Sequence, residues 1–378
     1  MSNVECSLSN VRWKRWAAVA LALFHTTFTL QQPAAAAQPA FQPALPGYDF
    51  SFPRDHGGHE EYKTEWWYYT GHLETDAGKR YGFELTFFRV GLVPRGGPVT
   101  TRWDLRDLSL AHFAISDAGA NDFRYYEKLN RSSPFTAGAA AGVLDVFNEG
   151  WHATTLADGS WRIAAYGGSR DAIDLIVTSH KAPAVHGENG ISVKAEGAGY
   201  ASHYYSMSRL EVRGRVNGAA CHGLAWMDHE FGSSQLRESQ QGWDWFSIQL
   251  DNDAELMLYQ IRRTDGTPDV TSSGSLISSE GNVIHLRRDQ IVITPLSSWH
   301  STKSGATYPM GWRVAVPSFG IALVLRPLMK DQELMTRSST RVTYWEGAVD
   351  VAGSFGNVAI NGQGYVELTG YDRAFRAP

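Results

Sequence analysis

Ionisable side chains lie among large aromatic residues between Gly223 and Leu250. The segments GLAWMDHEF and GWDWFSIQL together hold two Asp, one Glu, one His and three Trp. A carboxyl or imidazole group surrounded by apolar rings has a displaced pKa, because burial disfavours its charged form. Displaced pKa values are typical of sites that perform acid-base chemistry. The segment therefore indicates acid-base chemistry on an apolar substrate.

Asp244 is the first candidate for a proton donor. Alternate residues of a strand point to opposite faces, so Asp244 shares a face with Phe246 and Ile248. Trp243 and Trp245 lie on the other face by the same rule. Burial at the edge of an apolar face keeps a carboxyl group protonated, which predicts that Asp244 acts as a general acid.

The neighbouring strand offers acid and base candidates on both of its faces. His229 aligns with Phe231, whereas Asp228 and Glu230 align with Trp226. We predict His229, Asp228 and Glu230 as further catalytic residues. The sequence leaves open that these carboxylates, and Asp244 with them, cap turns or form structural ion pairs with arginines. The arginines available for such pairs are Arg262, Arg263 and Arg313.

A second aromatic cluster, EWWYY, occupies residues 65–69. In a strand, Trp66 and Tyr68 share one face, and Glu65 and Trp67 share the other. Core packing accounts for most rings in such a cluster. Some of them can instead line an apolar cavity inside a barrel.

Metal and cofactor chemistry is not expected. His56 and His59 are separated by a Gly pair and have ligand-like spacing, but a segment of this kind ahead of the first strand is more often solvated. The chain lacks the G-x-S-x-G, H-E-x-x-H, P-loop and G-x-G-x-x-G motifs. A serine hydrolase of the common kind is therefore disfavoured.

The elements that must position these residues are β-strands. Short runs of aromatic and β-branched residues recur along the chain, separated by turn pairs such as Asp265-Gly266 and Asn361-Gly362. This pattern predicts an all-β fold of the sandwich or barrel type. One short helix is expected at Arg326–Met335.

A polar stretch is the best candidate for the joint between two β domains, although a hairpin loop inside one barrel would look similar. Residues 232–241 contain little apolar sequence and interrupt the strand pattern. We therefore expect an N-terminal domain at 61–234 and a C-terminal domain at 235–378. A Pro- and Ala-rich segment at 38–60 precedes them and is expected to be an extended arm.

The first 37 residues have the pattern of a secretory signal peptide. Basic residues precede an apolar run from Trp16 to Leu30, and Ala34–Ala37 provides a small-residue cleavage site. The mature protein is therefore expected to be exported, to the bacterial periplasm or beyond the cell. A membrane anchor is the weaker alternative, because the apolar run is shorter than a bilayer span.

Net charge bears on the possible partners, and cysteine content bears on the possible nucleophiles. The formal net charge is −5, and loss of the signal segment leaves about −7 with no basic run. Nucleic acid is therefore an unexpected partner. Cys221 would be the single cysteine of the mature chain, and we expect a small buried residue rather than a nucleophile.

Several separate segments resemble one known family. They are TEWWYYTGHL, LAHFAISD, GLAWMDHEFGSSQL, GWDWFSIQLDNDAELMLYQIR, YPMGWRVAVP, YWEGAV and GQGYVELTGY. Together they resemble the carotenoid 1,2-hydratases (hydroxyneurosporene synthases) and their exported AttH-like relatives, often labelled predicted secreted hydrolases. The resemblance runs from about Asp49 to Tyr371. It implies two lipocalin-like β-barrels packed together, with a ligand cleft near their interface.

The resemblance also implies roles for the aromatic and acidic motifs around that cleft. Asp244 would protonate an isolated alkene, and His229 would orient the acid or the water. Trp243 and Trp245 would stabilise the resulting cation through their ring faces. The further ligand-binding candidates are Glu65, Trp66, Trp67, Trp226 and Tyr259.

Two functions follow from these expectations. The first is an exported lipocalin-like enzyme that hydrates or hydrolyses a hydrophobic small molecule, such as an isoprenoid or a lipid. The second is a non-catalytic carrier of an apolar ligand, or an envelope transport component that associates with an ABC transporter. Export would separate the protein from carotenoid synthesis, which favours an apolar ligand other than a carotene.

Overall fold

The computed structural model describes residues 40–98, 101, 104–188, 190–234 and 236–376, which belong to one compact unit. The predicted signal segment at 1–37 lies outside the described residues. Helical structure in the described chain consists of three short 3-10 turns: η1 (Arg54–His56), η2 (Arg288–Gln290) and η3 (Pro317–Phe319). No helix in this part of the chain has the length and apolar character needed to cross a membrane.

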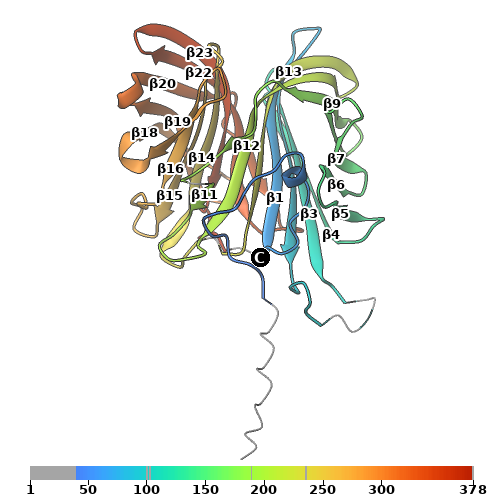
Figure 1. Cartoon of the computed structure of the whole chain (residues 1–378). Helices are drawn as coiled ribbons and strands as arrows, with labels where there is room; N and C mark the ends of the chain where they lie inside the picture. Colours follow the sequence, from blue (N-terminus) through green and yellow to red (C-terminus); the bar gives the residue numbers. More distant parts are fainter. Residues whose placement is uncertain (1–39, 99–100, 102–103, 189, 235, 377–378) are drawn as a thin grey trace, which may run out of the picture. The chain divides into compact units, whose positions relative to one another are not determined.

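The first sheet is antiparallel and has 13 strands (Figure 1). Its strands are β1 (Thr64–Thr75), β2 (Arg80–Gly91), β3 (Asp107–Asp117), β4 (Asp122–Arg131), β5 (Ala137–Ala139), β6 (Asp145–Asn148), β7 (Trp151–Thr155), β8 (Trp161–Gly167), β9 (Asp171–Ser179), β10 (Ala184–Val185), β11 (Ile191–Val193), β12 (Ala201–Val216) and β13 (Ala219–Gly232). They pair in the order β4-β3-β2-β1-β13-β12-β9-β8-β7-β6-β5, and β10 and β11 also pair with β12.

The second sheet is antiparallel and has 10 strands. Its strands are β14 (Gln240–Leu250), β15 (Glu255–Arg263), β16 (Ser273–Ile277), β17 (Val283–Arg287), β18 (Val292–His300), β19 (Thr307–Val316), β20 (Ile321–Pro327), β21 (Glu333–Met335), β22 (Thr343–Phe355) and β23 (Val358–Thr369). They pair in the order β17-β16-β15-β14-β23-β22-β20-β19-β18, and β21 pairs with β22. The chain passes from one sheet to the other between Gly232 and Gln240, within the polar stretch.

Both sheets are curved, the first into a nearly closed barrel and the second into a half-barrel (Figure 1). Each encloses its own apolar core, with Trp67 and Trp151 in the first and Trp312 and Trp345 in the second. The prediction of an all-β fold built from two barrel-like units is confirmed. Cys221 is a buried free cysteine in the first core, as expected for a small apolar residue.

A third buried cluster joins the two sheets. It contains Tyr204 and Trp226 from the first sheet together with Trp245 and Tyr259 from the second. The indole of Trp245 donates a hydrogen bond to the Tyr204 hydroxyl over 3.0 Å. Side chains on one face of each sheet therefore fill the space between the sheets rather than the interior of either barrel.

Strand register determines which motif residues reach this interface. In the β1–β13 pair, Trp66 lies opposite Glu230 and Tyr68 lies opposite Asp228. Residues directly opposite each other share a face of the sheet. Asp228 is thereby directed toward the second sheet, whereas its neighbour His229 points into the first barrel.

The expected helix at Arg326–Met335 is wrong. This segment instead contains the end of β20 and the strand β21. Burial alternates along β20, with Ile321, Leu323 and Leu325 facing the core, and this period of two belongs to a strand.

The N-terminal arm is packed against the first barrel rather than solvated. His56 and His59 are both less than 8% exposed. The Trp67 indole donates to the His56 carbonyl over 3.0 Å, and the His59 ring stacks on Phe231 with ring centres 3.7 Å apart. The expectation of a solvated histidine segment is therefore wrong, because buried rings and carboxylates of the barrel hold it.

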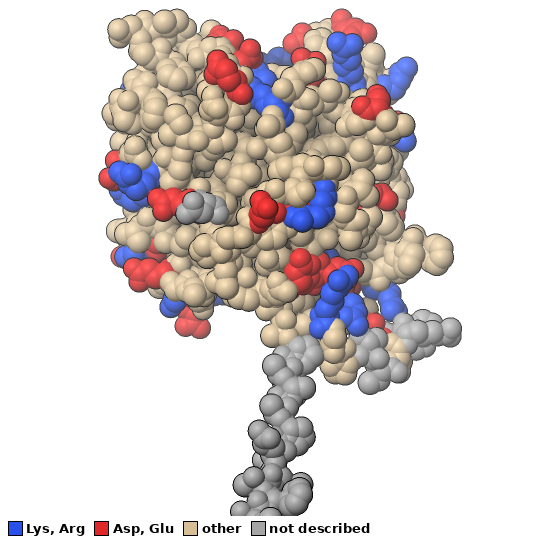
Figure 2. All heavy atoms as spheres, viewed as in Figure 1, with Lys and Arg blue, Asp and Glu red and all other residues tan. Residues whose placement is uncertain are grey.

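Charged side chains on the face shown in Figure 2 are of both signs and are scattered around a largely uncharged surface. Exposed ion pairs of the molecule include Arg80 with Asp350 and Arg162 with Asp174. Exposed pairs of this kind contribute about 1 kcal/mol or less each. The charges that bear on chemistry lie in the interior.

Candidate active site between the two sheets

A cavity of about 140 Å³ lies between the two sheets, and we call it the main cavity. β1, β12 and β13 supply one wall, and β14, β15 and β23 supply the other. Its aromatic lining residues are Trp66, Tyr68, Tyr204, Trp243, Trp245, Tyr259 and Phe375. Its charged or titratable lining residues, besides the tyrosines, are Lys194, Asp228, Glu230 and Glu367. The cavity is thus an aromatic chamber that contains three carboxyl groups and one ammonium group.

Asp228 is held by three hydrogen-bond donors. The Tyr204 hydroxyl and the Trp226 indole each donate to it over 2.5 Å, and the Ser206 hydroxyl also donates. Burial raises the pKa of Asp228 to about 7, although these hydrogen bonds favour the charged form. Asp228 can therefore exist as a well-supported carboxylate and accept a proton near neutral pH.

Glu230 is ion-paired within the same cavity. Its carboxylate lies 2.8 Å from the Lys194 ammonium and also accepts a hydrogen bond from Ser202. Burial alone would lower the pKa of Lys194, but the adjacent Glu230 charge raises it. The pair places an ammonium group on the wall of the chamber.

Glu367 reaches the cavity from the second sheet. It lies on β23 between the core residues Val366 and Leu368, so alternation directs its side chain away from that core. Thr369 donates a hydrogen bond to one of its oxygens over 2.9 Å. Burial raises the pKa of Glu367 to about 7. With fewer donors than Asp228, Glu367 is the better candidate for a protonated acid.

Two more buried carboxyl groups lie beside Glu367. Glu346 is directly opposite Glu367 in the β22–β23 pair and accepts a 2.5 Å hydrogen bond from the Tyr68 hydroxyl. Burial, together with the charges of Glu367 and Glu84, raises the pKa of Glu346 well above its usual value. Burial also raises the pKa of Glu84 to about 8. One oxygen of Glu84 and one of Glu346 have no hydrogen-bond partner among the described residues.

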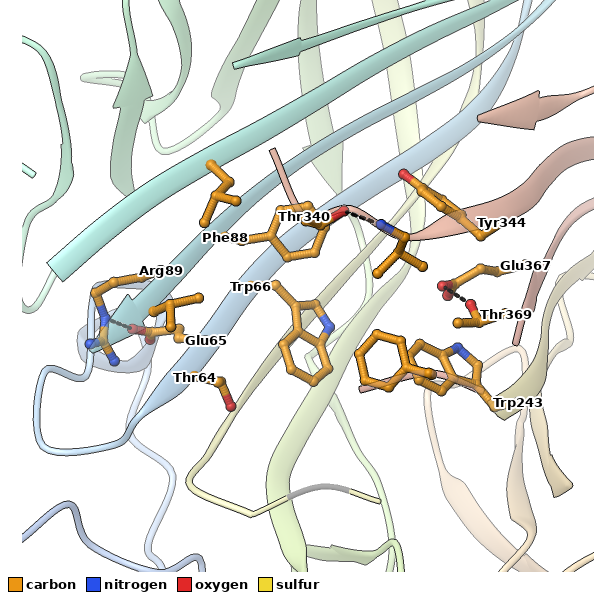
Figure 3. A pocket seen from close by; sticks show the side chains of 14 residues that line it. Thr64, Glu65, Trp66, Phe88, Arg89, Trp243, Thr340, Tyr344, Glu367 and Thr369 are labelled. Carbon is orange, nitrogen blue, oxygen red and sulfur yellow. Dashed lines mark hydrogen bonds and ion pairs between the residues drawn. The ribbon is translucent and has the colours of Figure 1, made fainter. Parts of the chain in front are cut away.

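A second, smaller cavity of about 90 Å³ adjoins the main one, and we call it the side cavity (Figure 3). Thr64, Trp66, Trp243, Glu367 and Phe375 line both cavities. The other apolar residues of the side cavity are Phe88, Val90, Leu110, Val342 and Tyr344. Its polar lining residues, besides the shared ones, are Glu65, Arg89, Thr340 and Thr369.

Asp244 lies outside both cavities. Its carboxylate is 2.9 Å from the Arg262 guanidinium and accepts a hydrogen bond from the Tyr371 hydroxyl over 3.0 Å. Burial raises its pKa, and the adjacent Arg262 opposes this shift. The side chain faces away from Trp243 and Trp245, as strand parity predicts. This is the structural ion pair that the sequence left open as an alternative.

His229 and Glu65 belong to a buried network inside the first barrel, not to the main cavity. Glu65 lies 3.0 Å from His229 Nε2, 2.8 Å from His59 Nδ1 and 3.0 Å from the Arg89 guanidinium. Burial alone would raise the pKa of Glu65, but these partners lower it well below its usual value. The pKa of His59 is raised to about 9 by hydrogen bonds with Asp55 and Glu65, against the effect of burial.

The same network contains a set of atoms that could hold a metal ion. One ligand atom each from His59, Glu65 and His229 lies within 4.8 Å of the others. Hydrogen bonds already join these atoms, and Arg89 supplies a competing positive charge to Glu65. The donor set therefore fits a hydrogen-bonded ion-pair network, which requires no metal.

The predicted tryptophan and tyrosine ligands divide between cavity walls and supporting positions. Trp66, Trp243, Trp245 and Tyr259 line the main cavity. Trp226 is 1% exposed and supports Asp228 from behind. Trp67 is also 1% exposed and stacks on His229 inside the first barrel.

The lining residues that were not predicted as site residues include Lys194, Tyr204, Glu367 and Phe375. Glu367 had a detectable signal, since it is a single acidic residue inside an alternating strand, YVELT. Lys194 and Phe375 lie outside the strands and carry no local signal. Their place in the cavity follows from tertiary packing alone.

The fold and site define a class of protein with two packed barrel-like sheets and, between them, a cavity that contains carboxyl groups. A family model described as AttH-like matches residues 43–371. The chain therefore belongs to the AttH-like family. The resemblance to AttH-like proteins seen in the sequence is confirmed.

Solved structures and a curated relative agree with this assignment. The crystal structure of an AttH protein from Nitrosomonas europaea is 34% identical, with a TM-score of 0.78, over 87% of this chain and 99% of that one. Kievitone hydratase from Nectria haematococca shares the fold at 16% identity, with a TM-score of 0.65, over 88% of this chain and 94% of that one. Kievitone hydratase from Fusarium solani subsp. phaseoli is 24% identical over 153 residues, which are 38% of this chain and 40% of that protein.

Proposed function

We propose that this protein is a hydratase-type enzyme that adds water across a carbon-carbon double bond of a largely apolar small molecule. The observation that carries the proposal is the pair Asp228 and Glu367, which line one aromatic cavity and have pKa values of about 7. The match to kievitone hydratase supports the same reaction class. Export and an isoprenoid or lipid ligand are part of the proposal and are supported by the sequence pattern.

Glu367 is the general acid of the proposed reaction. Its carboxylic O–H bond breaks, and the proton forms a new C–H bond with the electron pair of the alkene. The positive charge develops on the other alkene carbon, where the ring faces of Trp66, Trp243 and Trp245 stabilise it. An acid with a pKa near the working pH is suited to this step.

Asp228 completes the addition as the general base. A water oxygen forms the C–O bond to the cationic carbon, and the Asp228 carboxylate takes the proton that the water loses. Three donors hold this carboxylate in place, so it is oriented before the substrate binds. The assignment gives no catalytic role to Asp244, because that side chain is ion-paired outside the cavity.

The test has two stages, beginning with the ligand. Native mass spectrometry of the protein from its own host, followed by organic extraction, identifies any bound alkene. Incubation of that compound with the protein in heavy-oxygen water should then add one labelled water molecule. A bound compound that is retained but never gains mass would contradict the hydratase and favour the carrier.

Three matched carboxyl-to-amide variants assign the residues. Glu367→Gln and Asp228→Asn should each lower kcat at least about a hundredfold, since general acid-base groups contribute on this scale. Asp244→Asn makes the same chemical change outside the cavities and should retain turnover in protein that remains folded. Loss of turnover in Asp244→Asn alone would overturn this assignment and restore the acid role predicted from the sequence.

A further inference from the structure

The side cavity and the main cavity share one dividing wall. The Trp66, Trp243 and Phe375 rings make up most of this wall, and Thr64 and Glu367 also border both spaces. The Phe375 and Trp243 rings meet edge to face with centres 4.6 Å apart. The division therefore depends on three aromatic side chains rather than on backbone.

The two cavities differ in chemistry. The main cavity contains the Lys194–Glu230 pair and Asp228. In the side cavity, Arg89 and Glu65 contribute to the wall, but they are ion-paired with each other and largely buried (Figure 3). A ligand that filled both spaces would therefore meet an ammonium group in the main cavity and, in the side cavity, apolar side chains beside charges that are already paired.

Lys194 provides a hydrogen-bond donor in the main cavity. Its ammonium has three N–H bonds, and Glu230 is the carboxylate that pairs with it among the described residues. The ammonium also lies over the Tyr259 ring, 4.5 Å from the ring centre. An oxygen of a bound molecule can accept one of the remaining N–H bonds. Glu230 and Asp228 nearby would repel an anion, so a neutral hydroxyl or carbonyl oxygen fits this position.

We infer that the two cavities form one divided binding site for an elongated molecule with a neutral oxygen group at one end and an apolar arm at the other. The oxygen accepts a hydrogen bond from Lys194, and the apolar arm passes Trp66 and Trp243 into the side cavity. Placement of the double bond beside Glu367 rests on the proposed hydratase function. The two-part binding site itself does not depend on that function.

The C-terminal segment supplies part of the dividing wall. The Phe375 backbone N–H donates to the Gln241 carbonyl over 2.8 Å, and the Arg376 guanidinium reaches the Gln240 carbonyl over 3.3 Å. These contacts attach the segment to the start of β14, beside Trp243. Substrate length is therefore set partly by residues far from the acidic motifs.

Binding of straight-chain primary alcohols, from hexanol to tetradecanol, tests the divided site. Isothermal titration calorimetry measures binding, because its signal does not depend on the tryptophans that the variants remove or add. Affinity should rise about fourfold per added methylene until both cavities are filled. In Val342→Trp, which fills the side cavity, the rise should stop at a shorter chain.

Val292→Trp is the matched control, because it makes the same change at an exposed position on β18. Trp243→Ala opens the wall and should favour tetradecanol over hexanol more strongly than the wild type does. The same length dependence in wild type and in both cavity variants would overturn the divided site.

Lys194→Met tests the polar end. It should weaken binding of dodecanol about tenfold or more and leave dodecane binding unchanged, since a hydrogen bond to a charged group is lost. Equal effects on the alcohol and the alkane would overturn the oxygen contact. All of these measurements are of binding, so absence of turnover would count against the hydratase proposal alone.

Discussion

At the scale of single residues, the chemistry of this protein depends on which carboxyl groups hold a proton. Asp228 has three donors, whereas Glu346 has the Tyr68 hydroxyl and Glu84 has the Thr86 hydroxyl. The oxygens of Glu346 and Glu84 that have no partner are costly as charged atoms and acceptable in a neutral acid. Burial therefore favours the protonated form of Glu346 and Glu84, which lie beside Glu367.

We expect Glu346 and Glu84 to be protonated in the folded protein near neutral pH. Infrared spectroscopy should show the C=O stretching band of carboxylic acids, and the band should shift in heavy water. Glu346→Gln and Glu84→Gln should each remove part of it. Asp350→Asn, which changes an exposed carboxylate paired with Arg80, should leave the band intact. An unchanged band in both Glu variants would show that these groups are ionised.

Much of the cavity lining at residue scale was predictable, but the position of Glu367 in it was not. Strand parity alone separates Asp228 and Glu230 from His229, and the structure has them on opposite faces of β13. Both Asp244 and Glu367 are single acidic residues in alternating strands. Packing against the first sheet decides whether Asp244 or Glu367 points into a cavity. No local sequence pattern indicates that packing.

At the scale of elements, ion pairs hold the N-terminal arm against the first barrel. His59 is placed between Asp55 and Glu65, and Arg89 links Glu65 to Asp107. Arg89 also donates to the carbonyls of His59 and Tyr62, which fixes the arm backbone. The arm and the barrel thus share one ion network.

Arg89→Met should destabilise the protein by about 3 to 5 kcal/mol, because it leaves buried carboxylates without their partner. Urea unfolding measures this change. Arg80→Met is the matched control, since it breaks an exposed pair and should cost about 1 kcal/mol or less. Similar losses in the two variants would contradict a buried network that holds the arm.

The arm illustrates why some elements escape sequence analysis. Strands were predictable because each carries its own alternating pattern, as in DAIDLIVTS at β9. The arm has no period, and its two histidines are buried by partners on other elements. The His56 ring lies 2.7 Å from the Tyr205 hydroxyl on β12, and the His59 ring bonds to Glu65 on β1 and stacks on Phe231 of β13. Pro327 and the alternating burial of β20 are incompatible with the helix expected at Arg326–Met335. The short segment that follows Pro327 has no clear hydrophobic period.

At the scale of the whole molecule, buried titratable groups link folding to pH in two opposite directions. Burial lowers the pKa of several histidines to between about 3 and about 4, so the unfolded chain binds protons that the folded chain does not as pH falls below about 6.5. These residues are His56, His72, His112, His186 and His203. These histidines therefore lower the free energy of unfolding as pH falls below about 6.5.

The buried acids act on the other side of neutrality. Glu84, Asp228 and Glu367 have pKa values of about 8, about 7 and about 7, so the folded chain holds protons that the unfolded chain has lost above about pH 4.5. His59, with its pKa raised to about 9, acts in the same direction above about pH 6.5. Stability from these four groups is lost as pH rises through their folded pKa values.

The free energy of unfolding should therefore have a maximum near about pH 6 and fall on both sides, by about 1.4 kcal/mol per pH unit for each unbalanced proton. Urea titrations between about pH 5 and about pH 8.5 measure the curve. Glu84→Gln should flatten the fall above the maximum, because the amide has no proton to lose. Glu238→Gln, at an exposed position, should leave the slope unchanged. A free energy of unfolding that stays constant from about pH 6 to about pH 8 would mean that the acids between the sheets are ionised in the folded protein. Glu367 would then hold no proton to donate, and the proposed hydration step would be contradicted.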